Sequence, residues 1–237
     1  MRNTLATVPT GGETRTGEVL RLRREISRMQ RRRSDLTTVP VASALSPLFP
    51  EQGLPVGSVY TLSPSPSLVL ALMSAASQKG LWCAVIGMPT LGVEAAADFG
   101  MSLERLILVP DPGERWMAVT SALSEVVPLI AVHPSSRIRE AEIARLSARL
   151  RDRGCTLLVD APWPQSEGNI TLEDPSWSGL GEGWGLLSDR TATITARSRR
   201  DPAPHRVRVR LPNQHGEVES LAISSAPAQL SRWAAVG

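Results

Sequence analysis

Cysteine and histidine are scarce in this chain, which has two cysteines and three histidines in 237 residues. Cys83 and Cys155 lie in separate apolar segments and form no C-x-x-C pair, so we expect small buried core residues. The histidines are scattered, and neither an H-E-x-x-H sequence nor a nucleophile elbow accompanies them. The sequence therefore offers no motif for a metal site or for a nucleophilic enzyme.

Long apolar runs are also missing, since none approaches the roughly 18 residues that a membrane-spanning helix needs. The opening stretch, MRNTLATVPTGGETR, lacks the apolar segment of a secretion signal. These two observations predict a cytoplasmic protein.

Lysine occurs once, at Lys79, against 25 arginines, and the formal net charge is +3. The apolar content of 42% and the charged content of 21% are typical of a globular chain. Any function that requires a lysine side chain can therefore use only Lys79.

From Ser58 onward, short apolar segments alternate with segments of helical pattern. We expect strands in 58–62, 81–87, 103–110, 128–134 and 155–162, and helices in 67–79, 93–100, 114–126 and 138–153. The strands are continuous apolar runs, which indicates burial on both faces. The predicted fold class is α/β, with a mostly parallel sheet covered by helices.

The segment before this core is expected to contain a flexible tail over 1–16, then a basic amphipathic helix and a proline-punctuated linker over 17–45. Seven arginines lie between Arg21 and Arg33. The apolar residues of the helix recur at helical spacing: Val19, Leu22, Ile26 and Met29. This stripe is predicted to pack on another surface, either the chain's own core or a partner.

After Trp163 the pattern changes to a Gly-, Pro- and Trp-rich stretch that we interpret as a loop. TATITARS and HRVRVRLP then alternate with period two, which predicts a hairpin at the sheet edge. Its outer face would carry Arg206, Arg208 and Arg210, a candidate DNA-binding set. We expect the core to span 46–212 and an interaction tail to span 213–237, in which Leu230 and Trp233 are candidate partner contacts.

The strand-loop-helix at the start of the core has the layout of a phosphate-binding loop but not its chemistry. Such a loop uses glycines to turn backbone N–H groups toward phosphate, and a lysine to reach the β- and γ-phosphates. No glycine occurs between Ser58 and Lys79, and the loop reads Ser63, Pro64, Ser65, Pro66 and Ser67. We expect Ser65 to cap the helix with Pro66 at its first position, and we expect no nucleotide cofactor.

The carboxylates that could hold magnesium do not complete a site in the sequence. The strand PLIAVHP ends in His133, and Asp160 follows a later strand, where we expect it to cap or to bond a loop. Glu94 is expected to begin a helix, near the positive end of its dipole. Catalytic and metal residues are therefore predicted to be absent.

The order of the segments and their amino-acid sequences resemble the RecA-type core over about Ser46 to Leu211. The resemblance is carried by GLPVGSVYTLS, WCAVIG, DFGMSLERLILVPDPGE, PLIAVHP, TATITARS and HRVRVRLP. The lost phosphate loop and the arginine-rich helix are most similar to the ImuA-type proteins of actinobacterial mutagenesis cassettes. That resemblance implies a non-enzymatic partner of an ImuB-type inactive Y-family polymerase relative, acting with an error-prone C-family polymerase in damage-induced (SOS) translesion synthesis. It further implies a location at the nucleoid when the protein acts on damaged DNA, and self-association is a further expectation.

Two other functions remain open on the sequence. The arginine helix and the Arg206, Arg208 and Arg210 face suit a DNA-binding regulator of recombination, although no aromatic residues interleave with them for base stacking. The other open function is that of a RecA-like ATPase with a divergent phosphate loop. A salt-titrated single-strand binding assay and a nucleotide-binding assay distinguish these three functions.

Overall fold

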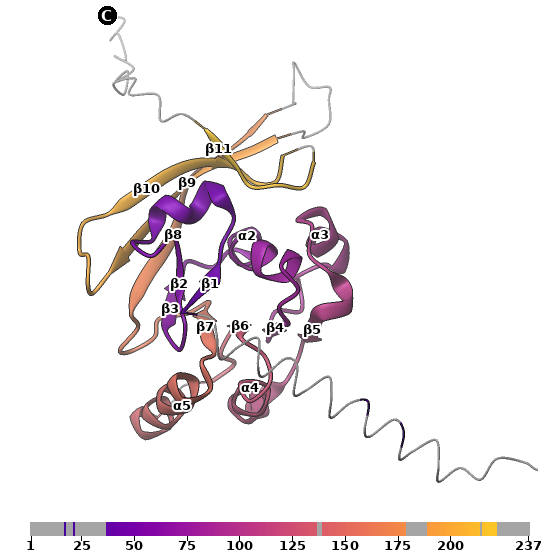
Figure 1. Ribbon diagram of the computed structural model, residues 1–237, viewed down its shortest axis with the longest axis vertical. Helices are drawn as coiled ribbons and strands as arrows, with labels where there is room; N and C mark the ends of the chain where they lie inside the picture. Colours follow the sequence, from indigo (N-terminus) through magenta and orange to yellow (C-terminus); the bar gives the residue numbers. More distant parts are fainter. Residues whose placement is uncertain are drawn as a thin grey trace, which may run out of the picture.

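A nine-stranded sheet organises the chain, as the computed structural model in Figure 1 shows. The structure describes Gly17, Arg21 and residues 37–136, 139–178, 189–213 and 215–221. The strands lie in the order β11-β10-β9-β8-β3-β7-β6-β4-β5. Their bounds are β3 Val59–Leu62, β4 Cys83–Ile86, β5 Leu106–Val109, β6 Leu129–Val132, β7 Thr156–Val159, β8 Gly168–Ser178, β9 Asp189–Ser198, β10 His205–Arg210 and β11 Glu219–Leu221.

Helices connect the parallel strands, as the alternating pattern predicted. They are α2 Pro66–Gln78, α3 Val93–Asp98, α4 Trp116–Leu123 and α5 Glu140–Arg153, with short 3₁₀ helices η1 Ser43–Leu48, η2 Leu103–Arg105 and η3 Gly113–Arg115. Strand β3 pairs in parallel with β7 and β8, and β4 pairs in parallel with β5 and β6. The α/β class with a mostly parallel sheet is therefore confirmed.

Both faces of the parallel strands are covered, α2 and α3 lying on one side and α4 and α5 on the other (Figure 1). In β6, Leu129 and Ala131 belong to the apolar cluster that contains α2. The alternate residues, Ile130 and Val132, pack in the cluster of α4 and α5. All four are fully buried, which explains why the strand is a continuous apolar run in the sequence.

The β9-to-β11 end of the sheet is antiparallel, and β9 and β10 form the predicted hairpin. The stretch before it was wrongly interpreted as a loop, because β8 pairs with β9 over most of its length. The pairing register shifts between Glu173 and Ser176, and Asp174 has a φ of 49°. This irregularity breaks the two-residue period that would have identified a strand.

Strands occur beyond the predicted core boundaries of 46 and 212. At the far edge, β11 pairs with β10. At the near end, β1 Thr38–Pro40 and β2 Gly53–Pro55 form a two-stranded sheet around η1. Val39 and Leu45, from the predicted linker, are fully buried, as is Leu54 of β2. The prolines of this stretch are typical of a linker, but they also fit a 3₁₀ helix and short strands. Across the described ranges, no helix combines the length and apolarity that crossing a bilayer demands.

Candidate functional site

The loop between β3 and α2 has the predicted helix-start geometry. Ser65 is the N-cap of α2, its Oγ accepts a hydrogen bond from the backbone N–H of Leu68 at 3.3 Å, and Pro66 is the first helical residue. Ser63 is held by β8, since its N–H donates to the Ile170 carbonyl at 3.0 Å and its Oγ accepts from the Leu172 N–H at 2.9 Å. The loop is thus anchored by contacts within the protein.

An arginine from the antiparallel half reaches this loop. The Arg190 guanidinium donates from Nη1 to Ser67 Oγ in the first turn of α2. The same guanidinium carbon lies 5.3 Å from the centre of the Trp177 ring, and the Trp177 side chain is 57% exposed. A cation gains nothing from the positive end of a helix dipole, so the serine and the aromatic ring are what hold Arg190 there.

The strand ends of β6 and β7 bring His133 and Asp160 together. His133 Nδ1 lies 3.0 Å from the Asp160 carbonyl oxygen and 3.5 Å from Asp160 Oδ2. The Asp160 side chain is only 12% exposed, and its Oδ1 is buried without a hydrogen-bond partner. Burial raises the pKa of the Asp160 carboxyl, and the nearby His133 opposes that shift.

The His133–Asp160 pair gains no third metal-binding side chain from the described residues. Among the residues whose positions are described, no group of three His, Cys, Asp or Glu side chains could hold a metal ion. The two cysteines are buried and form no disulfide, and burial raises the pKa of the Cys83 thiol to about 12. A thiol with so high a pKa is unsuited to act as a nucleophile.

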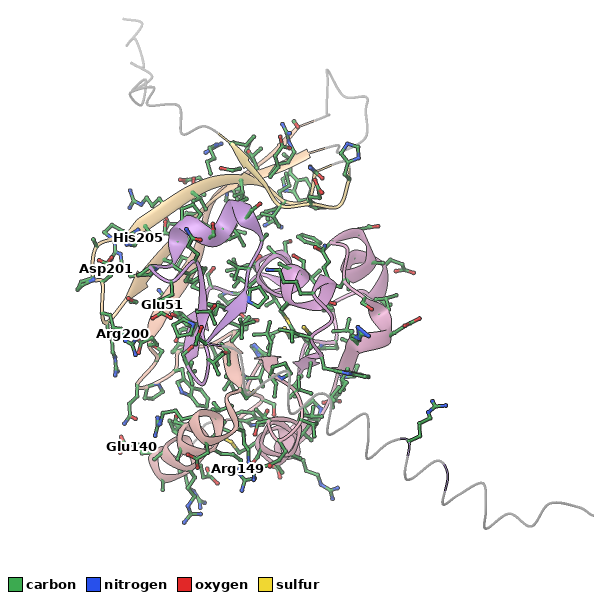
Figure 2. The ribbon with its side chains drawn as sticks, in the orientation of Figure 1. Glu51, Glu140, Arg149, Arg200, Asp201 and His205 are labelled. Atoms are coloured by element: carbon green, nitrogen blue, oxygen red, sulfur yellow. The ribbon has the colours of Figure 1, made fainter. Side chains whose placement is uncertain are left out.

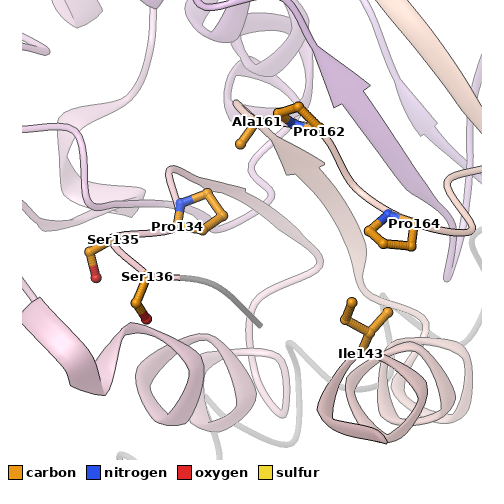
Figure 3. Close-up of a pocket in the computed structure, with 7 residues that line it drawn as sticks. All are labelled: Pro134, Ser135, Ser136, Ile143, Ala161, Pro162 and Pro164. Atoms are coloured by element: carbon orange, nitrogen blue, oxygen red, sulfur yellow. The ribbon is translucent and has the colours of Figure 1, made fainter. Parts of the chain in front are cut away.

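A cavity of about 480 Å³ lies beside the pair, between the loops that follow β6 and β7 and helix α5 (Figure 3). Its lining residues carry no ionisable side chain: they are Pro134, Ser135, Ser136, Ile143, Ala161, Pro162 and Pro164. The Ser135 hydroxyl donates to the Gly113 carbonyl at 2.6 Å, and Ser136 Oγ accepts from Trp116 Nε1 at 3.2 Å. A cavity of apolar walls and engaged hydroxyls suits the binding of an apolar group.

The arginines of β10 alternate with buried Val207, Val209 and Leu211, as predicted. They are not equivalent, however. Arg206 is exposed, and Arg208 is partly buried with Nη2 3.4 Å from Thr191 Oγ1. Arg210 is paired with Glu219 of β11 at 2.7 Å. The strand register places exposed Arg197 on the same face, because Arg206 lies opposite Thr195.

The predicted partner contacts all lie outside the described residues: they are Val19, Leu22, Ile26, Met29, Leu230 and Trp233.

The fold defines an α/β protein that carries a loop of serine and proline where a phosphate-binding loop would lie. A family model for the MT3502 N-terminal domain matches residues 47–165, half of the chain, and the protein therefore belongs to that family. The matched span includes the parallel strands β3 to β7, the His133–Asp160 pair and the cavity of Figure 3. Strands β8 to β11 lie outside it.

A curated relative is similar over much the same length. It is the Mycobacterium tuberculosis (strain ATCC 25618 / H37Rv) protein named "Uncharacterized protein Rv3395c", which is 36% identical over 112 residues. The alignment covers 46% of this chain and 55% of the relative, so the chain matches about half of that protein's length.

Sequence reasoning missed two features of this edge: Arg190 at the loop, and the contact of His133 with Asp160. Arg190 is 123 positions from Ser67, and no local pattern joins them. The histidine and the aspartate each follow an apolar strand directly, and this was the only signal for their proximity.

Proposed function

We propose that this protein is a non-catalytic accessory protein of damage-induced translesion DNA synthesis, built on a RecA-like core. Its proposed partner is an ImuB-type inactive relative of the Y-family polymerases, within an assembly that includes an error-prone C-family polymerase. The mostly parallel sheet with helices on both faces is compatible with such a core. The resemblance of the chain to ImuA-type proteins supports the choice of pathway.

The loop after β3 is the observation that carries the proposal. Pro64 and Pro66 have no N–H to offer a phosphate, Ser65 Oγ accepts from the helix, and Arg190 bonds Ser67. These hydroxyls bond groups of the chain itself, which supports a protein that does not use a nucleotide. A RecA-like core with such a loop is suited to bind proteins through its surfaces rather than to hydrolyse ATP.

A second candidate function is DNA binding on the outer face of the antiparallel strands. Arg197 and Arg206 are exposed there, and neither has an ion-pair partner among the described residues. Exposed arginines of this kind can neutralise DNA phosphates, and the resulting affinity falls steeply as the salt concentration rises. Substituting Arg197 and Arg206 with Gln should lower the affinity for single-stranded DNA at low salt if this function is real, and leave it unchanged otherwise.

The experiment for the leading proposal is genetic. In the source organism, deletion of the gene should abolish most damage-induced mutations while leaving spontaneous mutation rates unchanged. Complementation with the wild-type chain should restore them. An unchanged mutation frequency in the deletion strain would refute the proposal.

A further inference from the structure

A second cavity, which we call the Tyr60 pocket, lies away from the strand edge described above. It is bounded by Pro50 and Glu51 before β2, by Glu167 before β8 and by Arg200 and Asp201 in the turn between β9 and β10. The charged side chains gather on one flank of the molecule in Figure 2, where Glu51, Arg200, Asp201 and His205 are labelled. Its volume of about 260 Å³ is below the range of about 300–1,000 Å³ typical of small-molecule sites, so it has room for a side chain or a small group.

Tyr60 lines this pocket. Tyr60 is 3% exposed, and its ring makes an edge-on contact with Phe49. None of the described residues exchanges a hydrogen bond with its hydroxyl. This hydroxyl is not among the fully buried unpaired polar atoms of the described residues, so it is reachable from the pocket and can bond a ligand atom there.

Carboxylates outnumber cations around the pocket. Arg200 Nε lies 3.1 Å from Glu167 Oε1, and Arg200 Nη1 lies 3.8 Å from Glu51 Oε1. Asp201 Oδ2 lies 2.7 Å from Nε2 of His205, and this hydrogen bond lowers the pKa of Asp201. Three carboxylates therefore face one guanidinium and one imidazole.

The charged residues around the pocket also affect the pKa of Tyr60. Burial raises the pKa of Tyr60 to about 12, Glu167 and Glu51 add to the rise, and Arg200 opposes it. A negative pocket disfavours an anionic ligand. A metal ion is disfavoured too, because the described part of the chain has no metal-binding group of three side chains.

We propose that the Tyr60 pocket binds an arginine side chain presented by a protein partner. The guanidinium has five N–H donors, which can be shared between the Tyr60 hydroxyl oxygen and the carboxylates of Glu51 and Glu167. These two carboxylates already pair with a guanidinium, that of Arg200, whose side chain is 70% exposed and which an incoming arginine would displace. The mouth is open to a protruding residue, since the Glu51 side chain is half exposed. This inference goes beyond the proposed function and does not depend on which pathway the partner belongs to.

Tyr60 makes the test direct, because it is the only tyrosine in the chain. In full-length protein labelled with ¹³C-tyrosine, one ring signal reports the pocket. Titration with N-acetyl-arginine amide should move this signal in a saturable way. N-acetyl-citrulline amide, which has the same shape without the charge, should not move it.

Substitutions at the rim should change the affinity in opposite directions. Glu167→Gln should weaken binding by up to about fivefold, the upper end for one partly exposed charge pair. Arg200→Gln should strengthen binding, because it removes the competing cation. Glu104→Gln, an exposed change in η2, serves as the matched control and should leave the affinity unchanged.

Three results would overturn the proposal: no saturable shift, an equal shift with the citrulline compound, or undiminished binding by a Glu51→Gln, Glu167→Gln variant. A fourth concerns the chain's own arginines. If substituting Arg31, Arg32 and Arg33 with Gln moves the Tyr60 signal without added compound, the pocket is filled from within the chain and the partner proposal fails. None of these titrations uses a polymerase relative, so their failure leaves the proposed function untouched.

Discussion

Arg190 donates a hydrogen bond to Ser67 and thereby joins strand β9 to the first turn of α2. The two residues are 123 positions apart, and their contact lies at the start of the helix that follows the loop. A positive side chain of the protein, in contact with Trp177, thus stands beside this loop.

The first prediction concerns nucleotide binding. Isothermal titration calorimetry of the full chain with Mg-ATP should show no saturable heat at millimolar nucleotide. The missing lysine alone removes a charge-assisted contact worth about 1.5–3 kcal/mol, and the prolines remove amide donors as well. A micromolar dissociation constant would show that the loop retains its chemistry and would favour the divergent ATPase.

The buried Asp160 carboxyl should make stability depend on pH. Because its pKa is raised in the folded state, the neutral form is favoured by folding. Its contribution to stability is present at low pH and is lost as the pH rises through the folded pKa. Asp160→Asn should therefore melt at a higher temperature than wild type at pH 7, and this difference should shrink toward pH 3.

The control for this measurement is Asp152→Asn on α5, where the side chain is exposed. It should melt like wild type at both pH values. If Asp160→Asn melts lower than wild type at pH 7, the carboxylate makes a favourable contact in its charged form, contrary to the burial argument.

Gly87 follows β4 in a conformation that only glycine adopts easily. Its φ is 74°, and a Cβ there would lie 2.4 Å from the carbonyl oxygen of His133. Gly113 has a φ of 54° and open space around it, so Gly113→Ala carries only the backbone strain. Thermal denaturation should find Gly87→Ala less stable than Gly113→Ala by about 1–3 kcal/mol, the usual cost of overpacking. Equal stability of the two variants would mean that the loop at His133 shifts to make room for the methyl group without destabilising the fold.

The C-terminal segment should contribute to partner binding. Replacing Leu230 and Trp233 with Ala should weaken binding of the ImuB-type protein by about 2 kcal/mol or more, roughly thirtyfold, as truncation of interface anchors does. Trp177→Ala, which removes an exposed tryptophan elsewhere, should leave that affinity unchanged. Unaltered binding by the Leu230, Trp233 variant would exclude the tail as a contact, and a lowered melting temperature would show that it belongs to the core.

The alternation of strands and helices was predictable because each parallel strand is buried on both faces and reads as an apolar run. Strand β8 was not, since the register shift after Glu173 and the positive φ of Asp174 interrupt its period. The Ser65 cap could be predicted because capping is local. The contacts of Arg190 with Ser67 and of His133 with Asp160 depend on strand order, which local sequence does not encode.

The central claim is that the protein acts by binding an ImuB-type partner without using a nucleotide. Calorimetric titration of the purified full chain with that partner, first without nucleotide and then with Mg-ATP, measures this directly. The account predicts a complex with the same dissociation constant under both conditions. No complex under either condition, or a complex that forms only when ATP is present, would contradict it.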